Sequence, residues 1–197
     1  MTDDAPRSQI QTDRRQMIAE AALRVLESEG HAALTARKVA TEAGLALGHI
    51  SYHFTGMDEV LAEAYRLLSQ RLREEGDGGA ATLPPADRLA AFMRAGFGAR
   101  ILTPGHIRAR IDLWSAAAAH PAVAETELAL YRHYRTRLET LLAPLVAADR
   151  IAALTDTIMA TLDGLWLDWL RRRDSQAVEN GLATLLALVT LGPDGPA

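Results

Sequence analysis

Hydrophobic side chains recur along this chain at intervals of three and four residues, the spacing that places them on one face of an α-helix. The first such stripe consists of Ile18, Ala21, Ala22, Val25 and Leu26. It predicts a helix over residues 13–29, with Thr12 as its N-cap and Gly30 at its end. No segment alternates apolar and polar residues for long enough to predict a strand, so we expect an all-α fold.

Glycines, prolines and capping residues divide this helical pattern into about nine elements. After the first helix, we expect helices at residues 35–43, 47–53, 57–76, 86–102, 106–119, 122–142, 148–172 and 175–191. The strongest interruptions are the loop GDGGAATLPP at residues 76–85 and the run Thr103, Pro104 and Gly105. The tail GPDGPA is expected to be frayed.

Residues 35–54, TARKVATEAGLALGHISYHF, carry the most specific local pattern. Ala40 is small, as it must be if a second helix crosses directly over it, and Gly44 supplies the positive φ that reverses the chain. Ile50 then fills the angle between the two short helices. This spacing predicts a helix-turn-helix and therefore a DNA-binding protein.

Composition excludes several other classes. The chain has 197 residues, 49% of them hydrophobic, and no apolar run approaches the roughly 18 residues that a membrane span needs. Residues 1–16 hold charges but no apolar core, so we expect no secretory signal and a cytoplasmic protein. The absence of cysteine excludes disulfides and thiolate zinc sites. His106, Asp112 and His120 lack the spacing of a known metal site, so we expect neither a metal nor a cofactor.

The net charge of −4 and the sequence pI near 5.9 argue at first against a nucleic-acid-binding protein. Residues 1–56 hold six Lys and Arg against seven Asp and Glu, so even the expected DNA-binding segment is not basic overall. Local arrangement decides phosphate binding, and the acids of the first helix can face solvent. We expect modest affinity that depends strongly on dimerisation.

Residues 15–61 resemble the TetR family of one-component repressors, and the organisation of the whole chain is similar. The positions that carry the resemblance are Ile18, Ala21, Ala22, Gly30, Thr35, Val39, Ala40, Ala43, Gly44, Gly48, Ile50, Tyr52, His53, Phe54, Val60 and Leu61. Within the family, the segments GHISYHF, IDLWSAAAAHP and DGLWLDWL are most similar to the choline-responsive BetI branch. Members of that branch bind varied ligands, so the resemblance does not assign choline.

The resemblance implies that the helix at 47–53 enters the major groove of double-stranded operator DNA. The candidate contacts with bases are Leu47, Gly48 and His49. Leu47 can make apolar contact with a thymine methyl, Gly48 lets the helix approach closely, and His49 can form a hydrogen bond with a purine edge. Contacts with the phosphate backbone are expected from Ser51, Tyr52, His53, Thr55 and Thr35, with flanking charge from Arg14, Arg15 and Arg37.

Two positions depart from the family pattern. Ala46 stands where the family usually has a Ser or Thr cap, a change that typically costs about 0.5–2 kcal/mol of helix stability. Met57 stands where the family usually has a Lys that reaches phosphate. Both changes weaken the expected DNA affinity.

The resemblance also implies two domains: a helix-turn-helix domain at 1–56, with an arm at 1–12, and a ligand-binding and dimerisation domain at 57–197. Candidate ligand contacts are aromatic or acidic, namely Phe97, Asp112, Trp114, Tyr134, Asp163 and Trp166. Aromatic walls with convergent acids would suit a cationic effector, although rings that fill the core and solvated acids are the alternative. Candidate contacts of a homodimer, which could equally pack within one subunit, are Ile151, Leu154, Ile158, Leu162, Leu165, Leu182, Leu185, Leu186 and Val189.

We therefore interpret the chain as a transcriptional regulator, a repressor rather than an enzyme, which binds a pseudo-palindromic operator as a dimer and is released by a small molecule. A rival hypothesis is a helical ligand-binding protein or small enzyme whose helix-turn-helix no longer contacts DNA. A third is a dimeric scaffold that binds another protein, which would need an exposed apolar patch.

Overall fold

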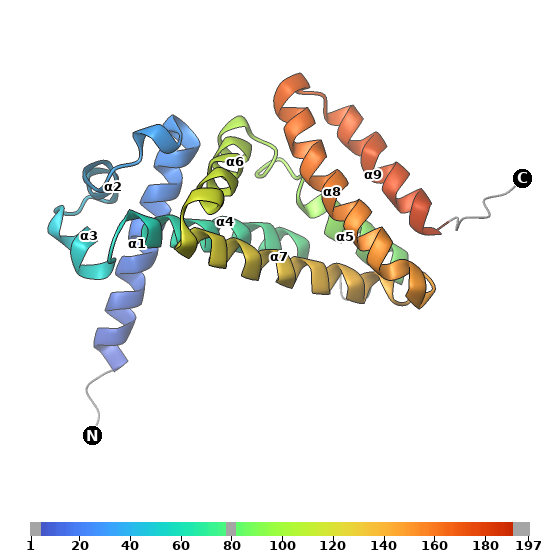
Figure 1. The fold of residues 1–197 in the computed structure, drawn as a ribbon, viewed down its shortest axis with the longest axis horizontal. Helices are drawn as coiled ribbons and strands as arrows, with labels where there is room; N and C mark the ends of the chain where they lie inside the picture. Colours follow the sequence, from blue (N-terminus) through green and yellow to red (C-terminus); the bar gives the residue numbers. More distant parts are fainter. Residues whose placement is uncertain (1–4, 78–81, 191–197) are drawn as a thin grey trace, which may run out of the picture. The chain divides into compact units, whose positions relative to one another are not determined.

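The computed structural model describes residues 5–77 and 82–190, and within these residues it contains helices and no strand. The α-helices are α1 (Ala5–Glu29), α2 (Ala36–Ala43), α3 (Gly48–His53), α4 (Met57–Asp77), α5 (Pro85–Ala95), α6 (Pro104–Ala119), α7 (Pro121–Leu142), α8 (Ala148–Arg172) and α9 (Ser175–Thr190) (Figure 1). A short 3-10 helix, His31–Ala33, follows α1. The all-α prediction is confirmed for this part of the chain.

Packing divides the chain into two compact units. The first unit contains residues up to Gln70 together with Pro104–Leu130, and the second contains Arg71–Thr103 together with the residues from Tyr131 onward. The long helices α4 and α7 contribute residues to both units. This division follows contacts between residues, whereas the expected boundary at residue 56 separates a DNA-binding part from a ligand-binding part. The two divisions therefore describe different properties of the chain.

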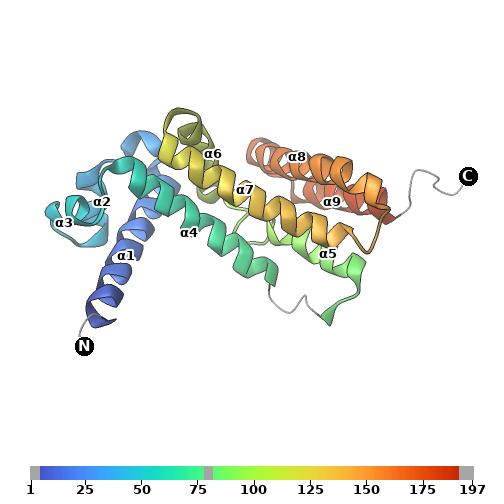
Figure 2. The ribbon, with the colours of Figure 1, turned by 60° about the horizontal axis from the view of Figure 1, so that its bottom comes forward.

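In the first unit, α2 and α3 lie on the same side of α1 (Figures 1 and 2). The stripe predicted on α1 is buried, and Ile18, Ala22 and Leu26 join Val39 and Ile50 in one hydrophobic core. Residues of α6 also enter this core, which therefore holds α6 against α1. The core fixes the angles between the helices that carry the candidate DNA contacts.

Two predictions about α1 and α6 are wrong. Helix α1 begins at Ala5, so Thr12 lies inside the helix rather than at its N-cap. The helix can extend to Ala5 because Pro6 stands in its first turn, where proline is tolerated. Helix α6 begins at Pro104 for the same reason. A Cβ on Gly105 would lie 2.6 Å from the Glu27 carbonyl oxygen, so glycine here permits close approach to the end of α1.

The fifth helix ends at Ala95 and not at residue 102 as predicted. The reason is a contact within the second unit: the Trp166 indole N–H donates to the Gly96 carbonyl oxygen at 2.7 Å. A Cβ on Gly96 would lie 3.1 Å from the Trp166 ring, so the small residue lets the indole fit against this turn. The segment between α5 and α6 therefore folds as turns.

Helices α8 and α9 lie side by side in the second unit (Figure 1). Arg173, at a φ of 56°, ends α8 in the left-handed conformation and donates its backbone N–H to the Trp169 carbonyl oxygen. A Cβ on Gly181 would lie only 2.8 Å from a methyl carbon of Leu165, so α9 approaches α8 closely at this glycine. The predicted tail GPDGPA and residues 78–81 of the predicted loop lie outside the described residues.

Candidate nucleic-acid interface and ligand pocket

The turn between α2 and α3 has the geometry that the sequence predicts. Gly44 adopts a φ of 67° and a ψ of 30°, and its N–H donates to the Ala40 and Thr41 carbonyl oxygens. Ala40 and Ile50 are 3% and 4% exposed, and both belong to the core beneath the turn. The roles predicted for these residues in the helix-turn-helix are confirmed, and the turn fixes α3 relative to α2.

Helix α3 presents most of its side chains to solvent. Tyr52 is 73% exposed and Leu47 is 48% exposed, large values for apolar side chains. Gly48, His49 and Ser51 are also exposed, and nothing lies within 4 Å of the position of a Gly48 Cβ. Only Ile50 of this helix is buried. The remaining residues thus form one continuous surface available to a partner.

Thr35 caps the N-terminus of α2, as predicted, by accepting a hydrogen bond from the Lys38 N–H at 3.2 Å. Thr35 and Arg37 are both exposed. The hydroxyls of Ser51 and Thr55, in contrast, donate within the protein, to the Gly48 carbonyl oxygen and the Glu59 carboxylate. A phosphate contact would require these two hydroxyls to turn away from those acceptors.

The two departures from the family pattern have visible consequences. The N-cap of α3 is Leu47, one residue after the expected cap position Ala46, and neither side chain has a polar atom that could accept a hydrogen bond from the first turn. Met57 is half-buried and packs against the core of the first unit. Its side chain therefore contributes to folding at a position where a lysine would reach into solvent.

A cluster of three side chains supports the end of α3. The Arg15 guanidinium lies 4.2 Å from the centroid of the Phe54 ring, and it donates to the Glu59 carboxylate at 2.7 Å and to the His53 carbonyl oxygen. Glu59 also accepts from the Thr55 backbone N–H at 2.8 Å. Through these contacts Arg15, which the sequence predicts to add positive charge beside DNA, also joins α1, α3 and α4.

At this end of α3, the pKa values of His53 and Glu59 depart from their ordinary range. Burial lowers the pKa of His53, and the neighbouring His49, Arg15 and Arg14 lower it further. The Thr55 backbone N–H and then the Arg15 guanidinium lower the pKa of Glu59. At neutral pH, His53 is therefore neutral and Glu59 is ionised. The His53 ring lies 4.9 Å from the Tyr52 ring and 6.5 Å from the His49 ring, measured between centroids.

The predicted ligand residues fall in both compact units. Asp112 and Trp114 belong to the first unit, where the Asp112 carboxylate accepts from the His31 backbone N–H at 2.8 Å. That bond caps the short 3-10 helix beside Gly30. In the second unit, the rings of Phe97 and Trp166 lie 5.7 Å apart, and Asp163 is half-buried on α8. The predicted set is thus divided between the two units.

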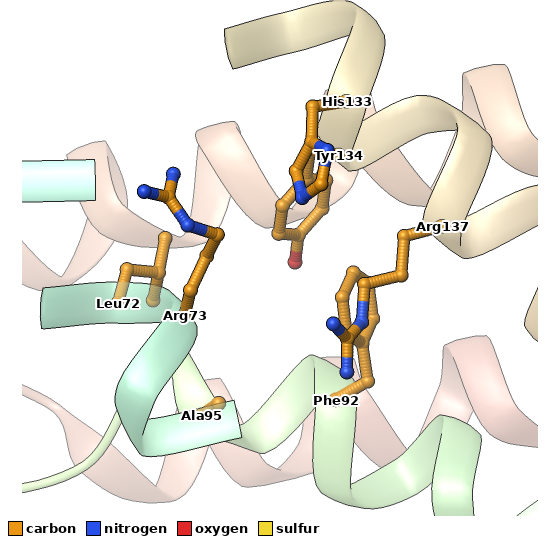
Figure 3. A pocket seen from close by; sticks show the side chains of 7 residues that line it. All are labelled: Leu72, Arg73, Phe92, Ala95, His133, Tyr134 and Arg137. Carbon is orange, nitrogen blue, oxygen red and sulfur yellow. The ribbon is translucent and has the colours of Figure 1, made fainter. Parts of the chain in front are cut away.

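Tyr134, one of the predicted ligand residues, lines a pocket in the second unit. Leu72 and Arg73 of α4, Phe92 and Ala95 of α5, and His133, Tyr134 and Arg137 of α7 surround this space (Figure 3). Its enclosed volume is about 20 Å³, roughly the space that one water molecule needs. The sequence gives no signal for the other six lining residues. Arginine and histidine on amphipathic helices usually form a solvated face, and Leu72, Phe92 and Ala95 resemble ordinary core positions.

The predicted dimer residues divide into two groups by burial. Ile158, Leu162, Leu182, Leu185 and Val189 are at most 4% exposed within a single chain. Ile151, Leu154, Leu165 and Leu186 are half-buried, and the neighbouring Leu188, which was not predicted, is 48% exposed. A dimer contact on these helices would therefore use the second group and Leu188.

No helix in residues 5–77 and 82–190 is long and apolar enough to cross a membrane. The same residues contain no group of three or more His, Cys, Asp or Glu side chains that could hold a metal ion.

Comparison with known protein families gives two matches. Residues 18–64 match the family of bacterial regulatory proteins called tetR, and residues 85–191 match the C-terminal domain of BetI-type transcriptional repressors. A curated relative, the HTH-type transcriptional regulator BetI of Rhizobium meliloti (strain 1021), is 26% identical over 82% of this chain and 80% of its own length.

Solved structures show the same fold. A putative transcriptional regulator from Pseudomonas aeruginosa PAO1 is 29% identical, with a TM-score of 0.78 over 90% of this chain and 89% of its own. The multidrug binding protein EbrR, solved with ethidium, is 27% identical, with a TM-score of 0.67 over 89% of this chain and 98% of its own.

Proposed function

We propose, on the premise that this chain belongs to the TetR family of transcriptional regulators and carries a BetI-type C-terminal domain, that it represses transcription by binding a pseudo-palindromic operator as a homodimer. The family consists of regulators, and we infer that this member has no catalytic role and acts in the cytoplasm, where its DNA would lie. We keep the boundary between its DNA-binding and effector-binding parts at residues 56 and 57.

The observation that carries this proposal is the exposed surface of α3. Tyr52 is 73% exposed, Leu47 is also exposed, and open space surrounds Gly48. This side of α3 is therefore not part of the protein interior. Exposed large apolar side chains of this kind usually mark a surface that binds a partner. Its length of six residues and its position after the Gly44 turn suit the major groove of duplex DNA.

Within this surface, we assign base contacts to Leu47, Gly48 and His49 and phosphate contacts to Tyr52 and Thr35. The pKa of His53 is lowered in the free protein, and its imidazole would donate an N–H to phosphate in the complex. Arg37 is exposed beside the cap of α2 and adds positive charge. The remaining candidates, Ser51 and Thr55, would contribute only after leaving their internal acceptors.

We further propose that the dimer forms through α8 and α9, as the sequence predicts. One α3 helix contacts too few base pairs for a specific site, so two are needed, about 34–36 Å apart on the same face of the duplex. The half-buried residues of α8 and α9 together with Leu188 supply apolar surface for this contact. Size-exclusion chromatography with light scattering should give a dimer at micromolar concentration, and a monomer would contradict this part.

A small-molecule effector would release the operator by stabilising a conformer in which the two α3 helices no longer match successive grooves. The sequence hypothesis of a cationic effector has one supporting observation, the ethidium bound by the similar EbrR. It also requires a carboxylate beside an aromatic wall. Asp112 already bonds the His31 N–H, so the candidate carboxylate is Asp163, which is half-buried on α8 in the same unit as Phe97 and Trp166.

Selection of protein-bound fragments from a random DNA library tests the function. A regulator of this type should enrich a twofold-symmetric motif. The rival hypotheses, a ligand-binding protein or enzyme that no longer contacts DNA and a scaffold for another protein, predict no enriched sequence. The uncapped start of α3 and the burial of Met57 make this outcome worth testing directly.

A further inference from the structure

The imidazoles of His49 and His53 lie on the same face of α3. The two residues are one helical turn apart, so their side chains stand one above the other. Their rings are stacked, with planes 13° apart and centroids separated by 6.5 Å. In a common class of metalloprotease, a helix uses this same spacing to supply two imidazoles to one zinc ion. The pair therefore has the arrangement of a bidentate metal chelate.

The ring nitrogens of this pair are available to a ligand. Within the part of the chain that the structure describes, the side chains of His49 and His53 contact aromatic rings but form no hydrogen bond or ion pair. His106 and His120 differ, because a carboxylate oxygen lies 3.6 Å and 3.1 Å, respectively, from their Nδ1 atoms. A metal ion could thus bind the α3 pair without displacing another group of the protein.

The core holds the backbone beneath the two imidazoles in place. Ile50 and Phe54 are 4% and 3% exposed, and the Arg15 guanidinium donates to the His53 carbonyl oxygen. Metal–nitrogen bonds of about 2.0–2.1 Å at a tetrahedral angle place two nitrogens about 3.3 Å apart, so the rings must turn toward each other. His49 can make this rotation because its side chain is exposed. Metal binding therefore requires side-chain rotation and no change of the helix.

The composition of the site selects the kind of ion. No group of three or more metal-binding side chains occurs among the described residues, so water would complete the coordination. Imidazole favours Cu²⁺ over Zn²⁺, whereas Mg²⁺ prefers oxygen ligands. Arg14 and Arg15 lie near His53 and repel a cation, although the Glu59 carboxylate, 2.7 Å from Arg15, offsets one of these charges. We expect micromolar affinity and an exchangeable ion.

We propose that His49 and His53 together bind one divalent transition-metal ion, Cu²⁺ in preference to Zn²⁺, and that the bound ion prevents α3 from contacting DNA. The second part rests on the proposed function, because the same two side chains are assigned there to base and phosphate contacts. The ion and its water ligands would occupy the surface that faces the duplex. Metal and operator would therefore compete for α3.

Calorimetry and electron paramagnetic resonance of the full chain, without a histidine tag and freed of metal by a chelator, test the first part. Titration with copper chloride should show one ion bound per chain at micromolar concentration. Zinc chloride should bind more weakly, and magnesium chloride should not bind. The resonance spectrum at equimolar copper should show splitting by two nitrogen nuclei. The absence of micromolar copper binding, or a spectrum without nitrogen ligands, would overturn the proposal.

Substitutions locate the ion. His49→Gln and His53→Gln should each weaken copper binding by about tenfold or more, because a single imidazole remains. His31→Gln is the matched control, since His31 is exposed in the same compact unit and is not paired with a second imidazole. Circular dichroism confirms that each variant is folded. Unchanged copper binding by His49→Gln, or an equal loss in His31→Gln, would place the ion elsewhere and contradict the proposal.

A competition experiment separates the failure of this inference from the failure of the regulator function. The DNA enriched by selection is bound to the protein, and fluorescence anisotropy follows its release as copper chloride is added. Release should occur at the copper concentrations that saturate the site, should be reversed by a chelator and should be absent with magnesium chloride. DNA that stays bound to the copper-loaded protein would reject the competition and leave the regulator function intact. Failure to enrich any DNA would reject the regulator function, whereas calorimetry would still decide whether α3 binds copper.

Discussion

The Arg15 guanidinium donates to the Glu59 carboxylate at 2.7 Å, across 44 residues of sequence. Arg15 lies on α1 and Glu59 in the first turn of α4, and between them Phe54 ends α3. Both side chains are about one-third exposed, so solvent screens the pair only in part. This contact connects α1 and α3 to α4, the helix that continues from the helix-turn-helix part at residues 1–56, which we call the head.

Glu59→Gln should lower the free energy of unfolding by about 1–2 kcal/mol, because the Thr55 N–H and the Arg15 guanidinium lose a charged acceptor. Urea denaturation followed by circular dichroism measures the change. The control is Arg24→Gln, which removes a more exposed ion pair with Glu42 and should cost at most about 0.5 kcal/mol. Equal losses in both variants would mean that the Arg15–Glu59 pair has no special role.

Gly44→Ala should destabilise the head by about 1–2 kcal/mol through backbone strain alone. The φ of 67° disfavours any residue with a Cβ, yet no atom lies within 4 Å of the position of that Cβ. Thermal unfolding of this variant is best compared with that of Gly48→Ala, which also adds a Cβ in open space but at a helical φ. A stable Gly44→Ala variant would show that the turn relaxes.

Gly48→Ala should keep the stability of the head and lose DNA affinity. The protein leaves the space around Gly48 empty, so the added methyl group would contact only the duplex. We expect at least a tenfold weaker complex with the enriched operator, measured by fluorescence anisotropy, and an unchanged melting temperature. Full affinity in this variant would mean that α3 does not approach the bases closely at this position.

His53 provides a prediction about pH. Its pKa is lower in the folded protein than in the unfolded chain, so the unfolded chain binds a proton first as the pH falls below about 6.5. The contribution of this residue to the free energy of unfolding is therefore constant above that pH and declines below it. Urea titrations at pH 8 and pH 5.5 should show a smaller decline for His53→Asn than for the natural protein. Histidines that do not interact with His53 contribute equally in both proteins, so the difference reports His53 together with its coupling to His49.

The parts of this molecule that could be predicted from sequence are those encoded by residues close together in the chain. The Gly44 turn, the Thr35 cap and most helix boundaries follow from local spacing, and the structure agrees with them. The early end of α5 could not be predicted, because it depends on Trp166, 70 residues away from Gly96. The Arg15–Glu59 pair was missed for the same reason.

The pocket that Tyr134 lines shows the same limit more strongly. Its lining comes from three helices, and nothing in the local pattern of α4 or α7 distinguishes Arg73 or Arg137 from an arginine in solvent. Aromatic and acidic residues were the visible candidates, but Asp112 serves as a cap for the 3-10 helix. Only the packing of the helices reveals which charges share a pocket.

The most direct test of the central claim, that the surface of α3 contacts bases and phosphates, compares two variants on the enriched operator and on each of its single-base changes. His49→Ala should remove the preference at one position in each half-site, because a base contact is lost. Tyr52→Ala should weaken binding to every sequence by a similar factor, because a phosphate contact is lost. If the natural protein binds all duplexes equally, or if His49→Ala weakens every sequence alike, α3 does not recognise DNA in the way proposed.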